Sequence, residues 1–350
     1  MMSPIRFGIV GCGGAAMPVC QAMQRSTCAT LALACDVDEA LARDVGERFG
    51  VPFTTSADEL FASPEVQAVY LAVPHDRLAP LARLALAAGK HALVEKPMAL
   101  SLDEADSLIE LAESRGLTLG VFYEMRYAGQ VAQARALVQA GTIGRIVGVR
   151  IQTLIDKSPE YWRSGLDGRS VSPWRGFKAR AGGGVTLMNT SHQLDALWHI
   201  TGLEVARVSG EIGALAASVE VEDTASVALR FDNGAIGGLY AGAHLAGSLA
   251  AERMYIYGLE GQLVVPQLYE PSPVRLFVRR AREDYAAGEW HELPVVAADT
   301  YGGAVDGFAR AVEAGQPAPI GGRDARRVLR TVLAMYQSAA EGRAVEIRRD

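Results

Sequence analysis

Short apolar runs alternate with amphipathic helical stretches along the first third of the chain. Bare apolar runs bounded by turn residues predict strands at 5–10, 31–35, 68–73, 91–94 and 117–122. Helices are predicted between them, and Ser101 with Glu104 forms a capping box at the start of one. Apolar strands that alternate with helices predict a parallel sheet covered on both faces.

From about residue 145 the apolar positions recur at every second residue instead. Val147, Val149 and Ile151 alternate with polar or small residues, and the same spacing returns at 225–231. Two more strands flank a turn at Glu260-Gly261 and predict a hairpin. This period of two predicts an antiparallel sheet with one wet face. The change in pattern divides the chain into predicted domains at 1–122 and 123–350.

Length and composition are those of an ordinary globular protein. The 350 residues suit two domains of ~150 residues each, and 49% hydrophobic residues suffice for a buried core. The net charge of −6, from 34 basic and 40 acidic residues, argues against a nucleic-acid partner, which requires phosphate neutralisation. The sequence lacks a continuous apolar run of the ~20 residues that a membrane span needs, so no membrane association is expected.

Four cysteines lie in the first tenth of the chain, at Cys12, Cys20, Cys28 and Cys35. A disulfide framework is normally spread over the domain that it connects, so this clustering favours reduced thiols and a cytoplasmic protein. The sequence contains no zinc-type cluster of cysteine and histidine, so no metal is expected.

A glycine-rich turn follows the first predicted strand and opens the first predicted helix. In its pattern G-x-G-x-x-A the first glycine permits a tight turn, the second lets a pyrophosphate approach the backbone, and the alanine allows helix and strand to pack closely. The turn comprises Gly11, Cys12, Gly13, Gly14, Ala15 and Ala16. Asp36 ends the next strand, where it would bind the adenosine ribose and repel a 2′-phosphate. The motif predicts NAD as cofactor, with NADP disfavoured.

Further motifs follow the glycine turn in a definite order. They are Val73-Pro74-His75, Glu95-Lys96-Pro97, Arg126-Tyr127, Trp174-Arg175, and Gly182-Gly183-Gly184 followed by His192 and Asp195. This ordered set resembles the Gfo/Idh/MocA family of glucose–fructose oxidoreductases, inositol dehydrogenases and their relatives. The resemblance extends over nearly the whole chain.

The resemblance implies a particular α/β fold. It implies an N-terminal Rossmann domain, with a doubly wound parallel sheet, and a C-terminal α/β domain with a large, mostly antiparallel open sheet. In relatives this sheet often forms a subunit interface, so a homodimer or homotetramer is expected. The Lys96–Pro97 peptide bond is often cis in relatives.

Three positions depart from the family pattern: Met188, His75, and Leu78, which stands where the family usually has a histidine. Met188 stands where family dehydrogenases usually place an aspartate four residues before the histidine, and Asn189 follows it. His75 replaces the asparagine of Thr-Pro-Asn. The first departure puts in doubt any mechanism that uses an aspartate and histidine pair at that spacing.

Three residues are the candidates for catalysis. His192 suits the acid–base role because a histidine pKa lies near neutrality. Lys96 could polarise a carbonyl oxygen and lower the pKa of the alcohol. Asp195, one helical turn after His192, could orient the imidazole or bind a substrate hydroxyl. The alternatives are a core histidine, a surface lysine, or a metal site at His192, Asp195 and His199, which would compete with the nicotinamide.

The resemblance also assigns residues to binding roles. Expected cofactor contacts are the glycine turn 11–16, Asp36, Val73, Pro74, His75, Glu95, Lys96, Arg126 and Trp174. Expected substrate contacts are Tyr123, Tyr161, Trp162, Arg175, Asn189, His192 and Asp195.

The segment 157–180 is predicted to form a substrate loop. It carries six basic and two acidic residues in an acidic protein, together with Tyr161, Trp162 and Trp174. Aromatic faces stack on sugar rings, and arginines bind carboxylates or phosphates, which favours a carbohydrate-like substrate, including an anionic one. The arginines could equally serve cofactor phosphates, subunit contacts or solvation.

Together these features predict an NAD(P)-dependent oxidoreductase that transfers hydride between the cofactor and a sugar, polyol or sugar derivative. One alternative is a glycoside-cleaving enzyme whose tightly bound NAD is recycled within each turnover. Another is a non-catalytic dinucleotide-binding sensor.

Overall fold

The computed structural model describes residues 3–165, 167–247, 252–282 and 284–348. The chain forms two compact units, each assembled from separate segments. The first unit comprises 1–124, 159–182 and 301–329, and the second comprises 125–158, 183–300 and 330–350. The first segment of the first unit ends close to the boundary predicted near residue 122, but two later segments also belong to that unit.

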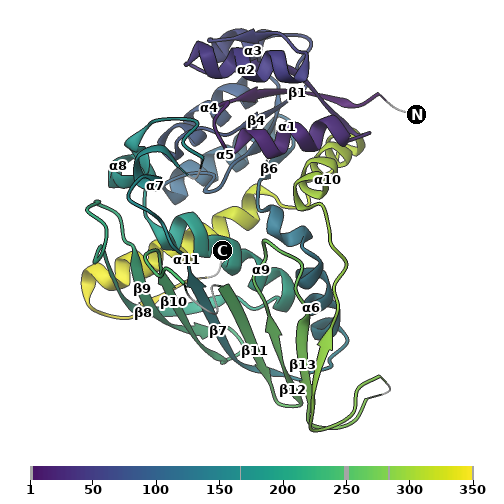
Figure 1. The fold of residues 1–350 in the computed structure, drawn as a ribbon, viewed down its shortest axis with the longest axis vertical. Coiled ribbons are helices and arrows are strands. Elements are labelled where there is room, and N and C mark those ends of the chain that lie inside the picture. Colours follow the sequence, from purple (N-terminus) through teal and green to yellow (C-terminus); the bar gives the residue numbers. More distant parts are fainter. Residues whose placement is uncertain (1–2, 166, 248–251, 283, 349–350) are drawn as a thin grey trace. The chain divides into compact units, whose positions relative to one another are not determined.

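The first unit contains a six-stranded parallel sheet with strand order β3-β2-β1-β4-β5-β6 (Figure 1). Its strands are β1 (Ile5–Val10), β2 (Ala29–Cys35), β3 (Phe53–Thr54), β4 (Ala68–Leu71), β5 (His91–Val94) and β6 (Leu119–Val121). Its helices are α1 (Ala16–Arg25), α2 (Glu39–Phe49), α3 (Ala57–Ala62), α4 (His75–Ala87), α5 (Leu102–Ser114), α7 (Tyr161–Ser164), α8 (Lys178–Ala181) and α10 (Thr300–Ala314).

The strand order reverses direction between β1 and β4. Because parallel crossovers are right-handed, helices on either side of this point lie on opposite faces of the sheet. Helix α1 packs with α2, and α4 packs with α5. This doubly wound sheet confirms the Rossmann expectation, and the carboxyl ends of β1 and β4 form the place where such sheets bind ligands.

Short local signals in the sequence account for the helix ends of this unit. Asp38 and Ser56 cap α2 and α3 through side-chain hydrogen bonds, and α2 stops at Gly50 with φ +69°. Ser101 accepts a hydrogen bond from the backbone N–H of Glu104, and the Glu104 carboxylate accepts one from the N–H of Leu100. The predicted capping box is therefore present.

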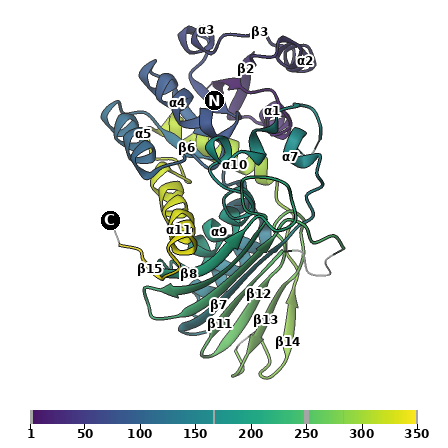
Figure 2. The ribbon, with the colours of Figure 1, turned by 90° about the vertical axis from the view of Figure 1, so that its left-hand side faces the viewer.

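The second unit contains a nine-stranded mixed sheet in the order β14-β13-β12-β11-β7-β10-β9-β8-β15, which runs as one twisted surface (Figure 2). Its strands are β7 (Ile146–Leu154), β8 (Val205–Gly213), β9 (Thr224–Phe231), β10 (Ile236–Gly242), β11 (Glu252–Gly258), β12 (Gly261–Val265), β13 (Val274–Val278), β14 (Trp290–Leu293) and β15 (Val345–Glu346). Its helices are α6 (Gly129–Gln139), α9 (Ser191–Thr201) and the second half of α11 (Gly322–Glu341). The short helices η1 (Glu124–Tyr127), η2 (Pro173–Gly176) and η3 (Thr186–Thr190) complete the fold.

The mostly antiparallel character of this sheet agrees with the period of two in the sequence. The predicted hairpin is the pair β11 and β12, and only β7 with β10 is parallel in this sheet. The sequence did not indicate β10, because Gly237, Gly238 and Gly242 interrupt its apolar alternation.

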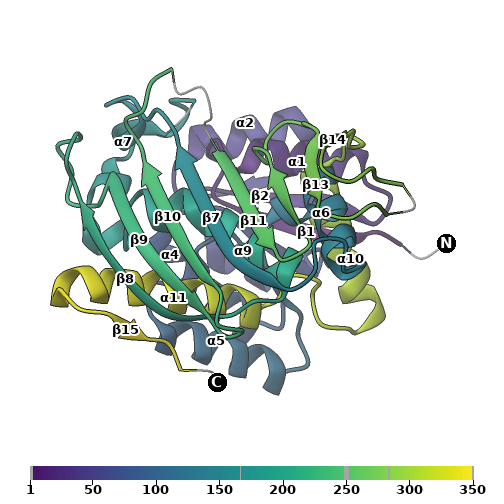
Figure 3. The same cartoon turned by 90° about the horizontal axis from the view of Figure 1, so that it is seen from below.

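One face of the nine-stranded sheet packs on α6 and α9, which lie behind the strands in Figure 3. The opposite face carries side chains that are not buried, among them Ile236 and Tyr240 at 56% and 42% exposure. Tyr255 and Tyr257 stack on that face with ring centroids 6.3 Å apart, and the Arg150 guanidinium lies over Tyr255.

Within the described part of the chain, none of the helices has the length and apolar character needed to cross a bilayer.

Candidate functional site

The glycine-rich turn leads from β1 into α1 with little side-chain cover. Gly11 has φ +92°, and a Cβ at this position would collide with the carbonyl group of Ala72, so only glycine fits. A Cβ on Gly13 would meet nothing closer than 3.6 Å. Ala15, at the N-cap of α1, makes no side-chain hydrogen bond to the first turn. These features fit a backbone that receives phosphate oxygens.

Asp36, which directly follows β2, contacts this turn. One carboxylate oxygen accepts a hydrogen bond from the N–H of Cys12 (2.7 Å), and the other accepts one from the N–H of Asp38 (2.9 Å). The carboxylate thus lies directly beside the glycine turn, as the dinucleotide fingerprint requires.

A segment distant in sequence, 167–170, also lies against the turn. Nε of Arg169 donates a hydrogen bond to the carbonyl oxygen of Cys12 (2.9 Å), and Nη2 pairs with the carboxylate of Asp44 on α2 (2.5 Å). A Cβ on Gly14 would collide with the carboxylate of Asp167. The role of Asp44 was missed from sequence, because the exposed face of an amphipathic helix carries no signal of a partner 125 residues away.

Lys96 follows β5 inside a cluster of ionisable groups. The Tyr70 hydroxyl donates a hydrogen bond to Glu95 (2.6 Å), whose other oxygen accepts the N–H of Lys96 (3.1 Å). Loss of hydration lowers the pKa of Lys96, and the carboxylates of Glu95 and Glu124 act against that change. The Lys96–Pro97 peptide bond is cis, as the resemblance implied.

His75 opens α4 directly after Val73 and Pro74, and it is buried. Its Nδ1 lies 2.8 Å from the carbonyl oxygen of Ala181, and its ring packs on Trp174 with centroids 4.5 Å apart. Burial, with smaller effects from Lys96 and Arg175, lowers the pKa of His75 to about 3. A carbonyl only accepts, so the neutral ring carries its proton on Nδ1 and offers Nε2 as an acceptor.

Arg175 contacts aromatic side chains of the predicted substrate loop. Its guanidinium lies 4.6 Å from the ring centroid of Trp174 and 5.4 Å from that of Tyr161. Tyr161 in turn packs edge-on against Trp162, with centroids 5.4 Å apart. Tyr123, the other substrate candidate of this unit, is buried just beyond β6.

The second unit carries His192 near the start of α9. A π-helix, η3, runs directly into α9, so the helix bearing His192 begins with an irregular turn. Such π segments occur often at functional sites. Met188 is buried within η3, Asn189 beside it is half-buried, and His192 is 6% exposed.

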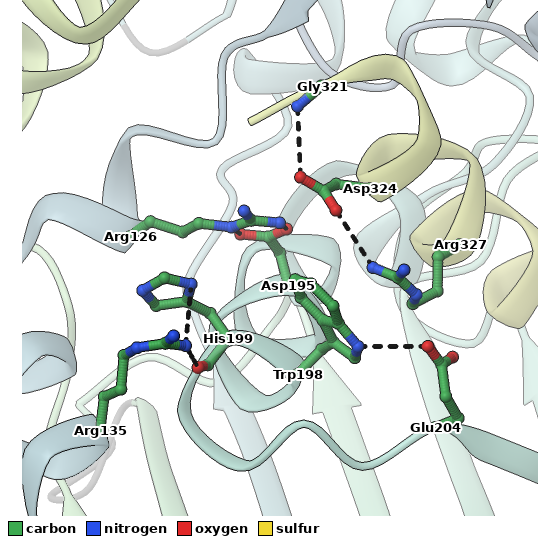
Figure 4. A network of polar contacts seen from close by, with 9 residues as sticks. All are labelled: Arg126, Arg135, Asp195, Trp198, His199, Glu204, Gly321, Asp324 and Arg327. Atoms are coloured by element: carbon green, nitrogen blue, oxygen red, sulfur yellow. Dashed lines mark hydrogen bonds and ion pairs between the residues drawn. The ribbon is translucent and has the colours of Figure 1, made fainter. Parts of the chain in front are cut away.

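Asp195 is held by Arg126 in a two-point ion pair (Figure 4). Nε and Nη2 of Arg126 each lie 2.6 Å from one carboxylate oxygen, and both side chains are buried. The same guanidinium lies 5.3 Å from the ring centroid of Trp198. His199 contacts Arg135 through its ring and its carbonyl oxygen. Arg126 was expected at the cofactor, and the structure shows its contact with Asp195.

The structure therefore assembles the predicted residues in two groups. The first unit brings together the glycine turn, Asp36, the Lys96 cluster, His75 and the Arg175 aromatic group. The second unit brings together His192, Asn189, Asp195 and Arg126.

Comparisons with known proteins agree with this geometry. A model of an oxidoreductase family with an NAD-binding Rossmann fold matches residues 5–123, and a GFO/IDH/MocA C-terminal domain model matches 131–264. A 1,5-anhydro-D-fructose reductase of Ensifer adhaerens is 31% identical over 297 residues, which are 84% of this chain and 83% of the relative. A myo-inositol 2-dehydrogenase of Thermotoga maritima is 26% identical over 349 residues, or 98% of each protein.

Solved structures share the fold over the full length. Levoglucosan dehydrogenase in complex with NADH and L-sorbose has a TM-score of 0.87 at 22% identity, and the match covers 100% of both chains. The chain belongs to the Gfo/Idh/MocA family. It is an oxidoreductase with a nicotinamide dinucleotide as cofactor, and the glycine turn with Asp36 fits that cofactor.

Proposed function

We propose that the protein transfers a hydride between the nicotinamide cofactor and a carbinol carbon of a sugar, polyol or sugar derivative. The observation that carries this proposal is the first-unit group around Lys96. Lys96 interacts electrostatically with Arg175 and His75, and Arg175 lies against Trp174 and Tyr161. To bind a sugar ring and polarise its carbonyl or hydroxyl group, a site requires a lysine, aromatic rings and a guanidinium.

The substrate class has support from the relatives. The named relatives act on 1,5-anhydro-D-fructose and myo-inositol, a sugar derivative and a cyclic polyol. The two aromatic rings beside Arg175, those of Trp174 and Tyr161, suit such compounds.

The bound nicotinamide supplies the carbon that gives or takes the hydride. The protonated Lys96 would donate a hydrogen bond to the substrate oxygen and stabilise negative charge there. His192 would take the alcohol proton during oxidation and return it during reduction. Asp195 would be a positioning residue that holds the Arg126 guanidinium in place, since both of its oxygens already accept hydrogen bonds from that guanidinium.

The preference for NAD over NADP rests on Asp36. Its carboxylate lies beside Cys12, where a 2′-phosphate would meet like charge.

The open face of the nine-stranded sheet supports a homodimer or homotetramer. Ile236, Tyr240, Tyr255 and Tyr257 form an apolar and aromatic surface of the kind that subunit contacts bury. All four cysteines are free thiols, which supports a reducing, cytoplasmic location.

The first experiment is to denature the purified protein and assay the released nucleotide. The proposal predicts protein that binds added NADH reversibly and turns over a member of a panel, with NAD or NADP for compounds to be oxidised and with NADH or NADPH for 1,5-anhydro-D-fructose, which is reduced. The panel contains 1,5-anhydro-D-fructose, myo-inositol, levoglucosan and D-xylose. One NAD per chain that survives gel filtration, with glycoside cleavage and no NADH production, would instead establish the internally recycled cofactor.

The catalytic role of His192 is tested on whichever panel compound is turned over. His192→Ala should lower kcat by about two to three orders of magnitude and leave the NADH dissociation constant within about threefold. His199→Ala, which removes a histidine from the same helix, is the matched control and should retain kcat within a few-fold. Equal kcat values for the two variants would assign the proton transfer to another residue.

A further inference from the structure

Three adjacent glycines precede the helix that carries His192. Two of them have a close neighbour, Tyr336 at Gly183 and Glu222 at Gly184. A Cβ on Gly183 would collide with the hydroxyl of Tyr336, and a Cβ on Gly184 would collide with the backbone carbonyl of Glu222. Neither glycine has a positive φ, so the requirement for glycine here is close approach rather than backbone conformation. The room that these glycines leave is filled by Glu222 and Tyr336.

Glu222 satisfies three consecutive N–H groups at the start of this helix. Its carboxylate accepts hydrogen bonds from the N–H of Gly184 (2.6 Å) and of Thr186 (2.9 Å), one on each oxygen. Its backbone carbonyl accepts the N–H of Val185, which lies between them (3.0 Å). The first four N–H groups of a helix have no partners within the helix, and a single residue accepts three of them here.

Tyr336 on α11 holds the cap in place. Its hydroxyl donates a hydrogen bond to the Oε1 atom of Glu222 (2.9 Å), the same oxygen that accepts from Thr186. Glu222 is 7% exposed. Burial raises the pKa of Glu222, and the hydrogen bonds from Gly184, Thr186 and Tyr336 act against that rise. All donors on the carboxylate thus favour its ionised form.

The capped segment continues without a break to His192. The N–H of Met188 donates to the carbonyl oxygen of Gly184 (2.7 Å), which is an α-helical hydrogen bond, and the π-helix over Thr186–Thr190 and α9 from Ser191 continue the segment. Each hydrogen bond of a π-helix spans one more residue than that of an α-helix, so the π segment changes the rotation of the residues after it. The direction of the His192 side chain depends on where the first turn is anchored.

We propose that Glu222, locked by Tyr336 in the space left by Gly183 and Gly184, is a positioning residue that sets the orientation of His192 through the π-helix. This inference rests on the proposed catalytic role of His192 for its consequence in turnover. The orientation itself can be measured without any substrate.

The test uses the full-length protein labelled in its six histidines. The ring signal of His192 is identified by its loss in His192→Gln. In Glu222→Gln an amide N–H₂ replaces one acceptor oxygen opposite a backbone donor, so one of the three contacts with the helix start is lost while the side-chain volume is kept. The His192 ring signal should shift or split in Glu222→Gln, and the signals of the four histidines outside α9 should stay in place.

The matched control is the neighbouring carboxylate. Asp223 also accepts backbone N–H groups, from Leu215, Ala216 and Ala217, but it anchors a different turn. Asp223→Asn should lower thermal stability without moving the His192 signal. Tyr336→Phe, which removes only the hydroxyl, should move that signal less than Glu222→Gln and serves if the latter does not fold.

Kinetics give the second readout. With a sugar that the wild type turns over, Glu222→Gln should lower kcat by roughly tenfold to a hundredfold and leave KM for NADH unchanged. A His192 signal that stays in place in both Glu222→Gln and Tyr336→Phe would overturn the inference, as would a signal that Asp223→Asn moves equally. Absence of turnover on the panel would count against the proposed function alone, since the ring signal does not depend on it.

Discussion

The pKa of Lys96 is set by effects of its surroundings that oppose one another. Burial and Arg175 favour the neutral amine, whereas Glu95 and Glu124 favour the ammonium form. His75 and Tyr70 complete the surroundings, His75 as a neutral ring and Tyr70 as a hydrogen-bond donor to Glu95. In carbonyl reduction the useful form is the ammonium, so activity should fall as pH rises through the pKa of Lys96.

Glu95→Gln should therefore move the alkaline limb of the kcat/KM profile to lower pH, by about one unit. Removing the carboxylate takes away an effect that raises the pKa of Lys96, so the lysine loses its proton earlier. Tyr70→Phe is the matched control, because it removes the 2.6 Å hydrogen bond but keeps the charge of Glu95, and it should move the limb less. An unchanged or upward-shifted limb in Glu95→Gln would show that another group titrates there.

At this scale the sequence predicted residues that belong to local motifs. The glycine turn, Asp36 and the Glu95-Lys96-Pro97 tripeptide were found because their spacing along one strand and turn is fixed by the chemistry of the cofactor. The pairing of Asp195 with Arg126 spans 69 residues, and that of Asp44 with Arg169 spans 125. Such partners meet only through tertiary packing, and no periodicity in a single sequence records them.

Among the elements, the segment 159–182 gives two arginines different surroundings. Arg169 lies on the glycine turn through Cys12, and Arg175 lies among the aromatic rings. The sequence left open whether these arginines serve the cofactor or the substrate. Their contacts favour a division of labour, with Arg169 on the cofactor side and Arg175 on the substrate side.

Arg169→Ala should weaken NADH binding by roughly tenfold, because it removes a charged hydrogen bond that braces the turn. Arg175→Ala should leave NADH binding within about twofold and lower kcat/KM for the sugar. Fluorescence titration with NADH and steady-state kinetics on the same two variants provide the comparison. If Arg169→Ala and Arg175→Ala weakened NADH binding equally, the two arginines would not have separate roles, and Arg175 would also serve cofactor binding.

Element types were predicted better than element irregularities. Five of the six strands of the first sheet and the Ser101 cap follow from short apolar runs and one capping box, whereas the two-residue strand β3 has no such run and was not predicted. The π-helix η3 differs from an α-helix by a single residue per turn, and the apolar pattern of 185–188 is compatible with either. Glu222, which accepts the N–H groups at the start of this segment, is 36 to 38 residues away in sequence.

At the scale of the whole molecule, the open face of the nine-stranded sheet leads to a testable prediction about subunit association. If subunits associate through it, Ile236→Glu with Tyr240→Glu should convert the assembly to monomers in sedimentation velocity, because buried carboxylates would repel each other. Leu215→Glu, a change at a 77% exposed position outside the strands, should leave the assembly intact. A monomeric wild type, or an assembly unaffected by the double change, would show that this face has another use.

The discontinuity of the first unit has a consequence for how the chain is made. Phe7 in β1 packs on Phe308, with ring centroids 5.9 Å apart, and the N–H of Val121 in β6 donates to the carbonyl oxygen of Ile320 (2.9 Å). A nascent chain emerging from the ribosome therefore exposes part of the Rossmann core until residues 301–329 have been synthesised. Products of premature stops between residues 300 and 320 should be cleared by proteases as unfolded protein rather than persist as dinucleotide-binding fragments.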